Sequence, residues 1–130
     1  TSGRPDGPGT TDAFTPKYIF PGGYARGLSE IMEGSEPNKL LLTDVEVLRL
    51  HYYHTLAHWY GRTVDAKEQI VALYDERFYR MWTFYLAAGA SGFHFGSQVI
   101  YQLQYARDRH TLPITRDYMA EAEARYRKMG

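Results

Sequence analysis

Cysteine is absent from this chain of 130 residues. Its absence excludes disulfide bonds, thiolate metal sites and a cysteine nucleophile, and it is compatible with a reducing cytoplasm. No apolar run approaches the roughly 20 residues that a membrane-spanning helix needs, and the N-terminus lacks the pattern of a secretory signal peptide. Any membrane contact is therefore predicted to be peripheral.

An excess of charge of either sign is also missing, because 15 Lys and Arg residues balance 15 Asp and Glu residues. No net field would therefore recruit nucleic acid or an anionic membrane, and no block of like charges forms a tail. The chain is 44% hydrophobic and 15% aromatic, with twelve tyrosines. This composition is typical of one small folded domain and excludes a disordered chain.

Turn-forming residues dominate the start of the chain. Residues 1–16 are rich in Gly, Pro, Thr and Asp and predict a loop. Its GRPDGPG segment lacks the Lys-Ser/Thr of a phosphate-binding P-loop, so a plain loop is favoured over a nucleotide site. A Pro-Gly-Gly turn follows in KYIFPGG, and then a short helix with Leu28, Ile31 and Met32 on one face.

Helical patterns fill the middle and the end of the chain. The segment from Tyr52 to about Arg62 predicts one helix, and residues 66–88 predict a second with a strongly aromatic stripe. Asp65 is a plausible N-cap of that second helix, and GASG at 89–92 is expected to end it. A terminal helix is predicted to begin at Asp117.

Two segments have the pattern of β-strands, residues 39–50 and residues 97–107. Two strands this far apart in sequence rarely form a stable sheet alone. Taken by itself, the chain is therefore predicted to be an α+β piece with about four helices and two edge strands. It resembles the border of a larger sheet whose centre is missing.

Three histidines, His51, His54 and His58, fall within an arc of about 60° on a helix that turns about 100° per residue. Such a cluster could hold zinc or another borderline metal ion. No Asp or Glu lies within the stretch, however, and a second stripe on the same helix would pack inward, formed by Tyr52, Leu56 and Trp59. A polar helix flank is therefore favoured over a metal site.

The remaining polar residues suggest no self-contained active site. His94 and His110 are isolated, and no Gly-x-Ser-x-Gly elbow or Cys/His pair is present. Asp44 and Glu46 are more informative, because acidic residues within a strand need either solvent or a partner. Their spacing alone does not distinguish a surface edge from a site.

Three strings give a more specific indication: KYIFPGG (17–23), TDVEVLRLHYYHTLAHWY (43–60) and YDERFYRMWTFYLAAGASGF (74–93). Together they resemble the cyclopropane-fatty-acyl-phospholipid synthases and the related mycolic acid cyclopropane synthases, in order, over residues 1 to about 107. The resemblance implies the C-terminal portion of a class I S-adenosylmethionine-dependent methyltransferase, an α/β, Rossmann-like fold whose last strand is antiparallel. It implies that the segment 17–110 holds the last two strands with acyl-pocket helices, between the loop (1–16) and the terminal helix (111–130) that the sequence pattern predicts.

The resemblance also implies chemistry. Family members transfer a methylene group from S-adenosylmethionine to a double bond of a phospholipid acyl chain through a carbocation, with bicarbonate as the base. By position, Tyr52 is implied to help hold the bicarbonate, and Gly89 stands where the family often has cysteine. The residues implied to line the acyl pocket are Phe20, Leu56, Tyr85, Gly89 and Phe93.

Other parts of the family site are expected upstream of Thr1, including the S-adenosylmethionine loop and the remaining bicarbonate ligands. Ser2 stands at the position where, in the family, the backbone of a usually aliphatic residue contacts bicarbonate. We therefore expect no cofactor-binding residue in this chain, no activity of the chain alone, and an N-terminal cofactor-binding half as its partner. A cytoplasmic location with peripheral contact at the inner membrane face is implied, and homodimerisation stays open. Simple methylation of the double bond and a non-catalytic acyl-binding or assembly module are the alternatives.

Overall fold

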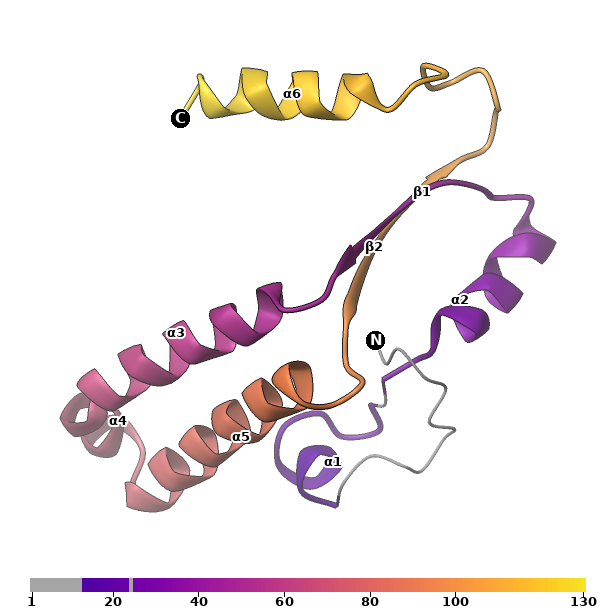
Figure 1. The fold of residues 1–130 in the computed structure, drawn as a ribbon. Coiled ribbons are helices and arrows are strands. Elements are labelled where there is room, and N and C mark those ends of the chain that lie inside the picture. The colour runs from indigo at the N-terminus through magenta and orange to yellow at the C-terminus, as the bar shows by residue number, and fades with distance from the viewer. Residues whose placement is uncertain (1–12, 24) are drawn as a thin grey trace.

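A computed structural model describes residues 13–23 and 25–130. The predicted loop over residues 1–12 and the expected role of Ser2 lie outside these residues. The elements follow in the order α1 (Phe14–Tyr18), α2 (Leu28–Ser35), the 3₁₀ turn η1 (Glu36–Asn38), β1 (Leu41–Leu48), α3 (His51–Asp65), α4 (Lys67–Leu73), α5 (Glu76–His94), β2 (Ile100–Ala106) and α6 (Asp117–Arg127) (Figure 1).

The two predicted strands are confirmed and pair with each other in antiparallel orientation. The pairing runs from Leu41 opposite Ala106 to Leu48 opposite Ile100, with an irregularity between Leu42 and Asp44. Each strand is shorter than predicted, because residues at both ends turn into the neighbouring helices and loops. This arrangement of helices with one two-stranded antiparallel sheet is the α+β piece that the sequence predicts.

The two-stranded sheet has two chemically different faces, because successive side chains of a strand point to opposite sides. Asp44 and Glu46 lie opposite Gln104 and Gln102 on one face. Val45 and Val47 lie opposite Leu103 and Tyr101 on the other face.

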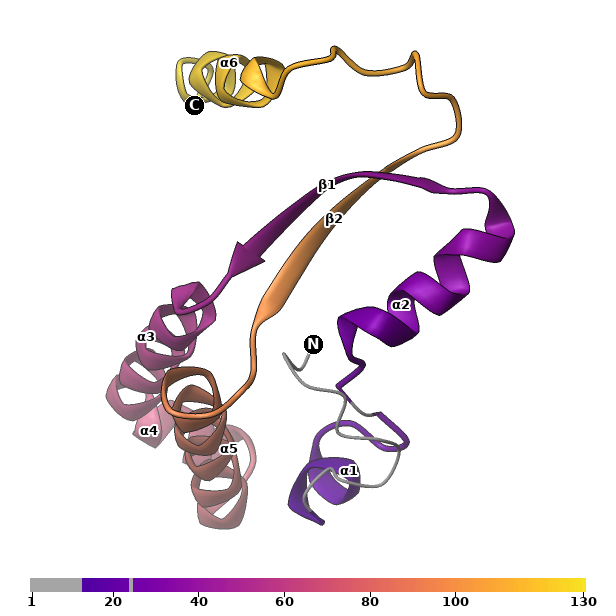
Figure 2. The same cartoon turned by 45° about the vertical axis from the view of Figure 1, so that its right-hand side comes forward.

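Two long helices, α3 and α5, lie side by side at one end of the sheet in both views (Figures 1 and 2). Their contact buries the two least exposed side chains of the described chain, Leu56 at 1% and Leu86 at 0% relative exposure. The predicted inward stripe of α3 is therefore confirmed at Leu56, whereas Trp59 lies at the rim with 37% exposure.

The predicted single helix over residues 66–88 is wrong at its middle. It is broken after Leu73, and α5 begins after Asp75, whose backbone is extended and whose carboxylate accepts a hydrogen bond from the Phe78 amide at 2.6 Å. Asp65 is the last residue of α3 and is not a cap. Because the N-cap Asp75 lies within the aromatic stripe, the apolar periodicity runs on across the break and does not reveal it.

The predicted end of that helix at GASG is also wrong, since α5 continues to His94. Its glycines lie at close contacts: a Cβ at Gly89 would come within 3.2 Å of Leu56 Cδ1, and one at Gly92 within 2.7 Å of Gln98 Oε1. Tertiary packing thus outweighs the cost of about 1 kcal/mol that glycine imposes inside a helix.

Structure also begins earlier than predicted near the N-terminus, because α1 covers residues that were expected to be loop. The Phe14 ring packs edge-to-face on Phe84 of α5 with centroids 4.8 Å apart, which supplies the tertiary contact that a five-residue helix needs. The Pro-Gly-Gly turn is confirmed, with Gly22 in the left-handed region at φ 74°.

The terminal helix begins at Asp117 as predicted, and it lies apart from α3 and α5 in both views (Figures 1 and 2). It is held by Arg116, whose Nη2 donates to Asp44 Oδ1 at 3.1 Å, and by the Tyr118 hydroxyl, which lies 3.1 Å from Gln104 Oε1. Across the described residues, no helix is both long and apolar enough to cross a bilayer.

Candidate functional site

The facing sides of α3 and α5 bring together residues that the sequence resemblance singled out. The rings of Tyr52 and Phe93 are 4.9 Å apart in an edge-to-face arrangement, and Tyr52 also meets Trp59 at 6.1 Å. Such pairs are favoured by the ring quadrupoles and fix the orientation of the rings. Tyr52 is therefore held beside α5 by aromatic contact.

The other four residues continue the same surface. Leu56 lies one turn after Tyr52 and contacts Gly89, which lies one turn before Phe93. Phe20 reaches the same helix from the Pro-Gly-Gly segment, with its ring 6.2 Å from the Tyr85 ring in an edge-to-face arrangement. We refer to Phe20, Tyr52, Leu56, Tyr85, Gly89 and Phe93 as the aromatic cluster.

The aromatic cluster contains hydroxyl groups but no charged side chain. Burial, and to a smaller extent the neighbouring Tyr52 phenol, raises the pKa of Tyr85 above its ordinary value of 10.0. Tyr85 is therefore a neutral hydroxyl at physiological pH. The Tyr52 hydroxyl makes no hydrogen bond with another described residue, so its proton is available to an acceptor outside that part of the chain.

The three histidines of α3 lie on the outside of the helix. His51, His54 and His58 are all exposed, and the part of the chain that the structure describes contains no group of three His, Cys, Asp or Glu side chains able to hold a metal. His94 is also exposed and lies against the ring of Tyr53 at 4.5 Å. The exposed positions of these histidines are those of a polar helix flank.

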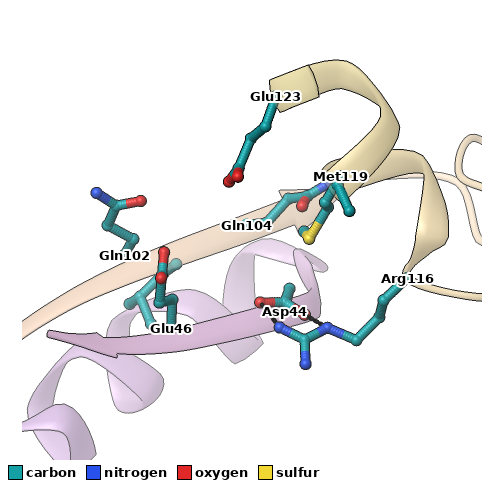
Figure 3. Close-up of a pocket in the computed structure, with 9 residues that line it drawn as sticks. Asp44, Glu46, Gln102, Gln104, Arg116, Met119 and Glu123 are labelled. Carbon is teal, nitrogen blue, oxygen red and sulfur yellow. Dashed lines mark hydrogen bonds and ion pairs between the residues drawn. The ribbon is translucent and has the colours of Figure 1, made fainter. Parts of the chain in front are cut away.

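A concave region lies between the polar face of the sheet and α6 (Figure 3). It is an open groove of about 570 Å³, with Glu46 and Gln102 projecting from the strands and Glu123 from α6. Here Asp44, with only 10% of its side chain exposed, forms its ion pair with Arg116. In the sequence, the signal for this groove is the pair of acidic residues within a strand. The sequence does not identify Arg116 as the partner of Asp44.

The described residues do not fit S-adenosylmethionine. A class I site needs a glycine-rich turn between a strand and the N-terminus of the next helix, where backbone amides approach the cofactor closely. Here β1 leads into α3 through Arg49 and Leu50, and β2 leads into residues 107–116, which contain no glycine. No reaction step can therefore be assigned to a cofactor held by these residues.

Comparison with known proteins gives the family. The family described as mycolic acid cyclopropane synthetase matches residues 4–103. A probable fatty acid methyltransferase of Pseudomonas putida is 38% identical over 121 residues, which are 90% of this chain and 30% of that relative. The cyclopropane-fatty-acyl-phospholipid synthase of Escherichia coli (strain K12) is 35% identical over 96 residues, 74% of this chain and 25% of that protein.

A solved structure agrees with these matches. The mycolic acid cyclopropane synthase CmaA1, complexed with SAH and CTAB, aligns with a TM-score of 0.69 at 30% identity, over 71% of this chain and 32% of that one. The chain thus spans about a quarter to a third of the length of these three proteins. On the family match and these similarities together, the chain belongs to the mycolic acid cyclopropane synthetase family.

Proposed function

We propose that this chain forms the acyl-chain side of the site in an S-adenosylmethionine-dependent enzyme that transfers a methylene or methyl group to the double bond of a phospholipid acyl chain. S-adenosylmethionine would supply the transferred carbon and would be bound by residues outside the described part of the chain. The names of the relatives support the class of reaction, since they include a fatty acid methyltransferase and a cyclopropane-fatty-acyl-phospholipid synthase.

The observation that carries the proposal is the uncharged aromatic cluster between α3 and α5. Phe93 is half-buried and offers an acyl chain a surface without charge, while Leu56, at 1% exposure, lies behind that surface in the contact between the two helices. The faces of aromatic rings attract a cation, so the same wall stabilises positive charge that develops on the chain. Exclusion of water from this wall in the complete enzyme would protect a carbocation from capture by water.

Tyr52 is assigned the polar role. Its hydroxyl is a neutral donor, which can hold bicarbonate without adding a cation that would lower the basicity of the bicarbonate. Bicarbonate held there would accept the proton that the acyl chain loses. Tyr85, which stays protonated, is a lining residue with no role in moving that proton.

The test is Tyr52→Phe in the enzyme that carries this chain. We expect turnover to fall roughly tenfold to a hundredfold, as for the loss of one oriented hydrogen bond at a reacting group, with unchanged affinity for S-adenosylmethionine. Added bicarbonate should restore part of the loss. Tyr53→Phe is the matched control, because this neighbouring ring packs on His94 and should leave turnover unchanged. Normal turnover of Tyr52→Phe would remove Tyr52 from the site.

Simple methylation is the second candidate, since the relative from Pseudomonas putida is named as a fatty acid methyltransferase. Proton NMR of the lipid product separates the two reactions, because cyclopropane ring protons resonate apart from those of a methyl or methylene branch.

We place the enzyme in the cytoplasm, in peripheral contact with the inner face of the membrane. The isolated chain should be inactive, and tight calorimetric binding of S-adenosylmethionine to it would contradict this assignment.

A further inference from the structure

The outer side of α5 presents a different surface from the side that packs on α3. Arg77, Arg80 and Phe84 follow at helical spacing and are all exposed, while Leu86 and Gly89 face α3. The short helix α1 attaches at this outer side through the edge-to-face contact of Phe14 with Phe84. Figure 1 shows α1 beside α5, on the side away from α3.

This outer surface exposes large apolar and aromatic groups. Tyr18 of α1 is 42% exposed and Phe84 of α5 is 57% exposed. The turn that leads into α5 adds Leu73 and Tyr74, which are 74% and 61% exposed. Tyr18 and Phe84 both contact Phe14, at ring distances of 5.1 and 4.8 Å, so these exposed rings of two elements adjoin one another and mark a contact surface.

Cations are interleaved with these rings. Lys17 Nζ lies 5.0 Å from the centre of the Tyr18 ring, and Lys17 followed by Arg77 lowers the pKa of Tyr18. Within residues 13–23 and 25–130, Lys17, Arg77 and Arg80 have no ion pair with a carboxylate. The acids at the start of α5 are engaged, because Glu76 pairs with Lys67 at 3.0 Å and Asp75 caps the helix.

We propose that the α1–α5 patch, formed by Lys17, Tyr18, Arg77, Arg80 and Phe84, docks the enzyme on an anionic phospholipid surface. Lys and Arg reach the phosphates while their stems lie along apolar groups, and aromatic rings sit at the level of the headgroups. The proposal rests on the proposed function, in which the substrate is an acyl chain in a bilayer. Cations whose stems lie beside exposed rings fit a surface that has anionic phosphates above an apolar layer, and an acidic protein is the competing partner that the test separates.

The position of the α1–α5 patch supports this partner. Phe84 points outward while the next residue, Tyr85, belongs to the aromatic cluster and contacts Phe20. Phe20 in turn follows Tyr18 by two residues. One turn of α5 and one short segment thus join the surface proposed for headgroups to the wall proposed for the acyl chain, so a lipid could enter without leaving the interface.

The test is vesicle co-sedimentation of the enzyme that carries this chain, with its three patch cations neutralised as Lys17→Gln, Arg77→Gln and Arg80→Gln. Vesicles of equal parts phosphatidylglycerol and phosphatidylcholine should bind the triple variant roughly a hundredfold more weakly than the wild type, from about 1 kcal/mol for each cation near an anionic surface. Vesicles of phosphatidylcholine alone should show little difference. The control neutralises three cations near the end of α6, Arg125, Arg127 and Lys128, and should bind as the wild type does.

Equal loss in the patch and control variants, or no loss in either, would overturn the proposal. A lower unfolding temperature of the patch variant together with unchanged vesicle binding would also overturn it, because the patch cations would then stabilise a contact with the rest of the enzyme and not with the membrane. Loss of binding to an acidic acyl-carrier protein, with vesicle binding intact, would assign the patch to that partner instead. Vesicle binding requires no turnover, so this result and the Tyr52→Phe result can fail separately.

Discussion

Leu56 of α3 and Gly89 of α5 lie in direct contact, so that a Cβ at position 89 would come within 3.2 Å of Leu56 Cδ1. Leu56 is 1% exposed, and the glycine lets the two helices approach closely at the centre of the aromatic cluster. This contact therefore sets both the stability of the helix pair and the width of the proposed acyl-chain wall.

Leu56→Ala should lower the free energy of unfolding of the enzyme by about 2–5 kcal/mol, because it leaves a cavity between α3 and α5. Gly89→Ala should change it by less than about 1 kcal/mol, since a gain in helix propensity offsets a small shift of the Leu56 side chain. Urea denaturation measures both. Leu73→Ala, at an exposed position, is the control and should cost less than about 0.5 kcal/mol. A loss for Leu56→Ala no larger than that of the control would contradict this packing.

Asp75→Ala should destabilise the enzyme by about 0.5–2 kcal/mol, because Asp75 Oδ1 accepts the hydrogen bond from the Phe78 amide that starts α5. Asp65→Ala is the matched control. Asp65 is the residue that the sequence suggested as a cap, but it ends α3, where a negative charge opposes the helix dipole. The unfolding temperature should therefore fall for Asp75→Ala and stay unchanged for Asp65→Ala. The reverse result would support Asp65 as the N-cap.

Arg116→Ala should loosen α6 from the sheet, because Asp44 has only 10% of its side chain exposed and loses its cationic partner. We expect a cost of about 1 kcal/mol, which corresponds to roughly fivefold faster amide hydrogen exchange in α6. Arg127→Ala breaks the exposed pair with Glu123 instead, where both side chains are more than half exposed. This control should leave the amide exchange of Asp44 and its neighbours unchanged. Equal protection of α6 in the Arg116→Ala and Arg127→Ala variants would argue against the role of Arg116 in holding α6 to the sheet.

Tyr85 should titrate above the ordinary tyrosine value of 10.0, because burial and then Tyr52 raise its pKa. A raised pKa in the folded state stabilises the fold below pH 10, and that contribution is lost as the pH rises above 10. The stability of the wild type should therefore fall more steeply above pH 10 than that of Tyr85→Phe. NMR of ¹³C-labelled tyrosine rings identifies the Tyr85 signal by its loss in the variant, and ionisation at or below pH 10 would contradict the buried position.

The sequence by itself determined the two strands, most of the helical segments and the family. Its alternation in 39–50 and 97–107 predicted two strands, and the periodic apolar positions predicted the inward stripe of α3 at Leu56. These features depend on local spacing, which repeats along the chain and can be read without knowing any neighbour. The resemblance then selected six residues, and the structure places them on one surface, although their roles stay proposals.

Only the tertiary structure decided where helices begin and end and which groups meet. Glycine at positions 89 and 92 predicts a break, but contacts with Leu56 and Gln98 keep α5 intact. Asp44 found its partner seventy-two residues away, at Arg116, and the cations of α1 and α5 form a patch in a chain of zero net charge. Such outcomes depend on the packing energy between distant segments, which exceeds local propensity and leaves no periodic trace in the sequence.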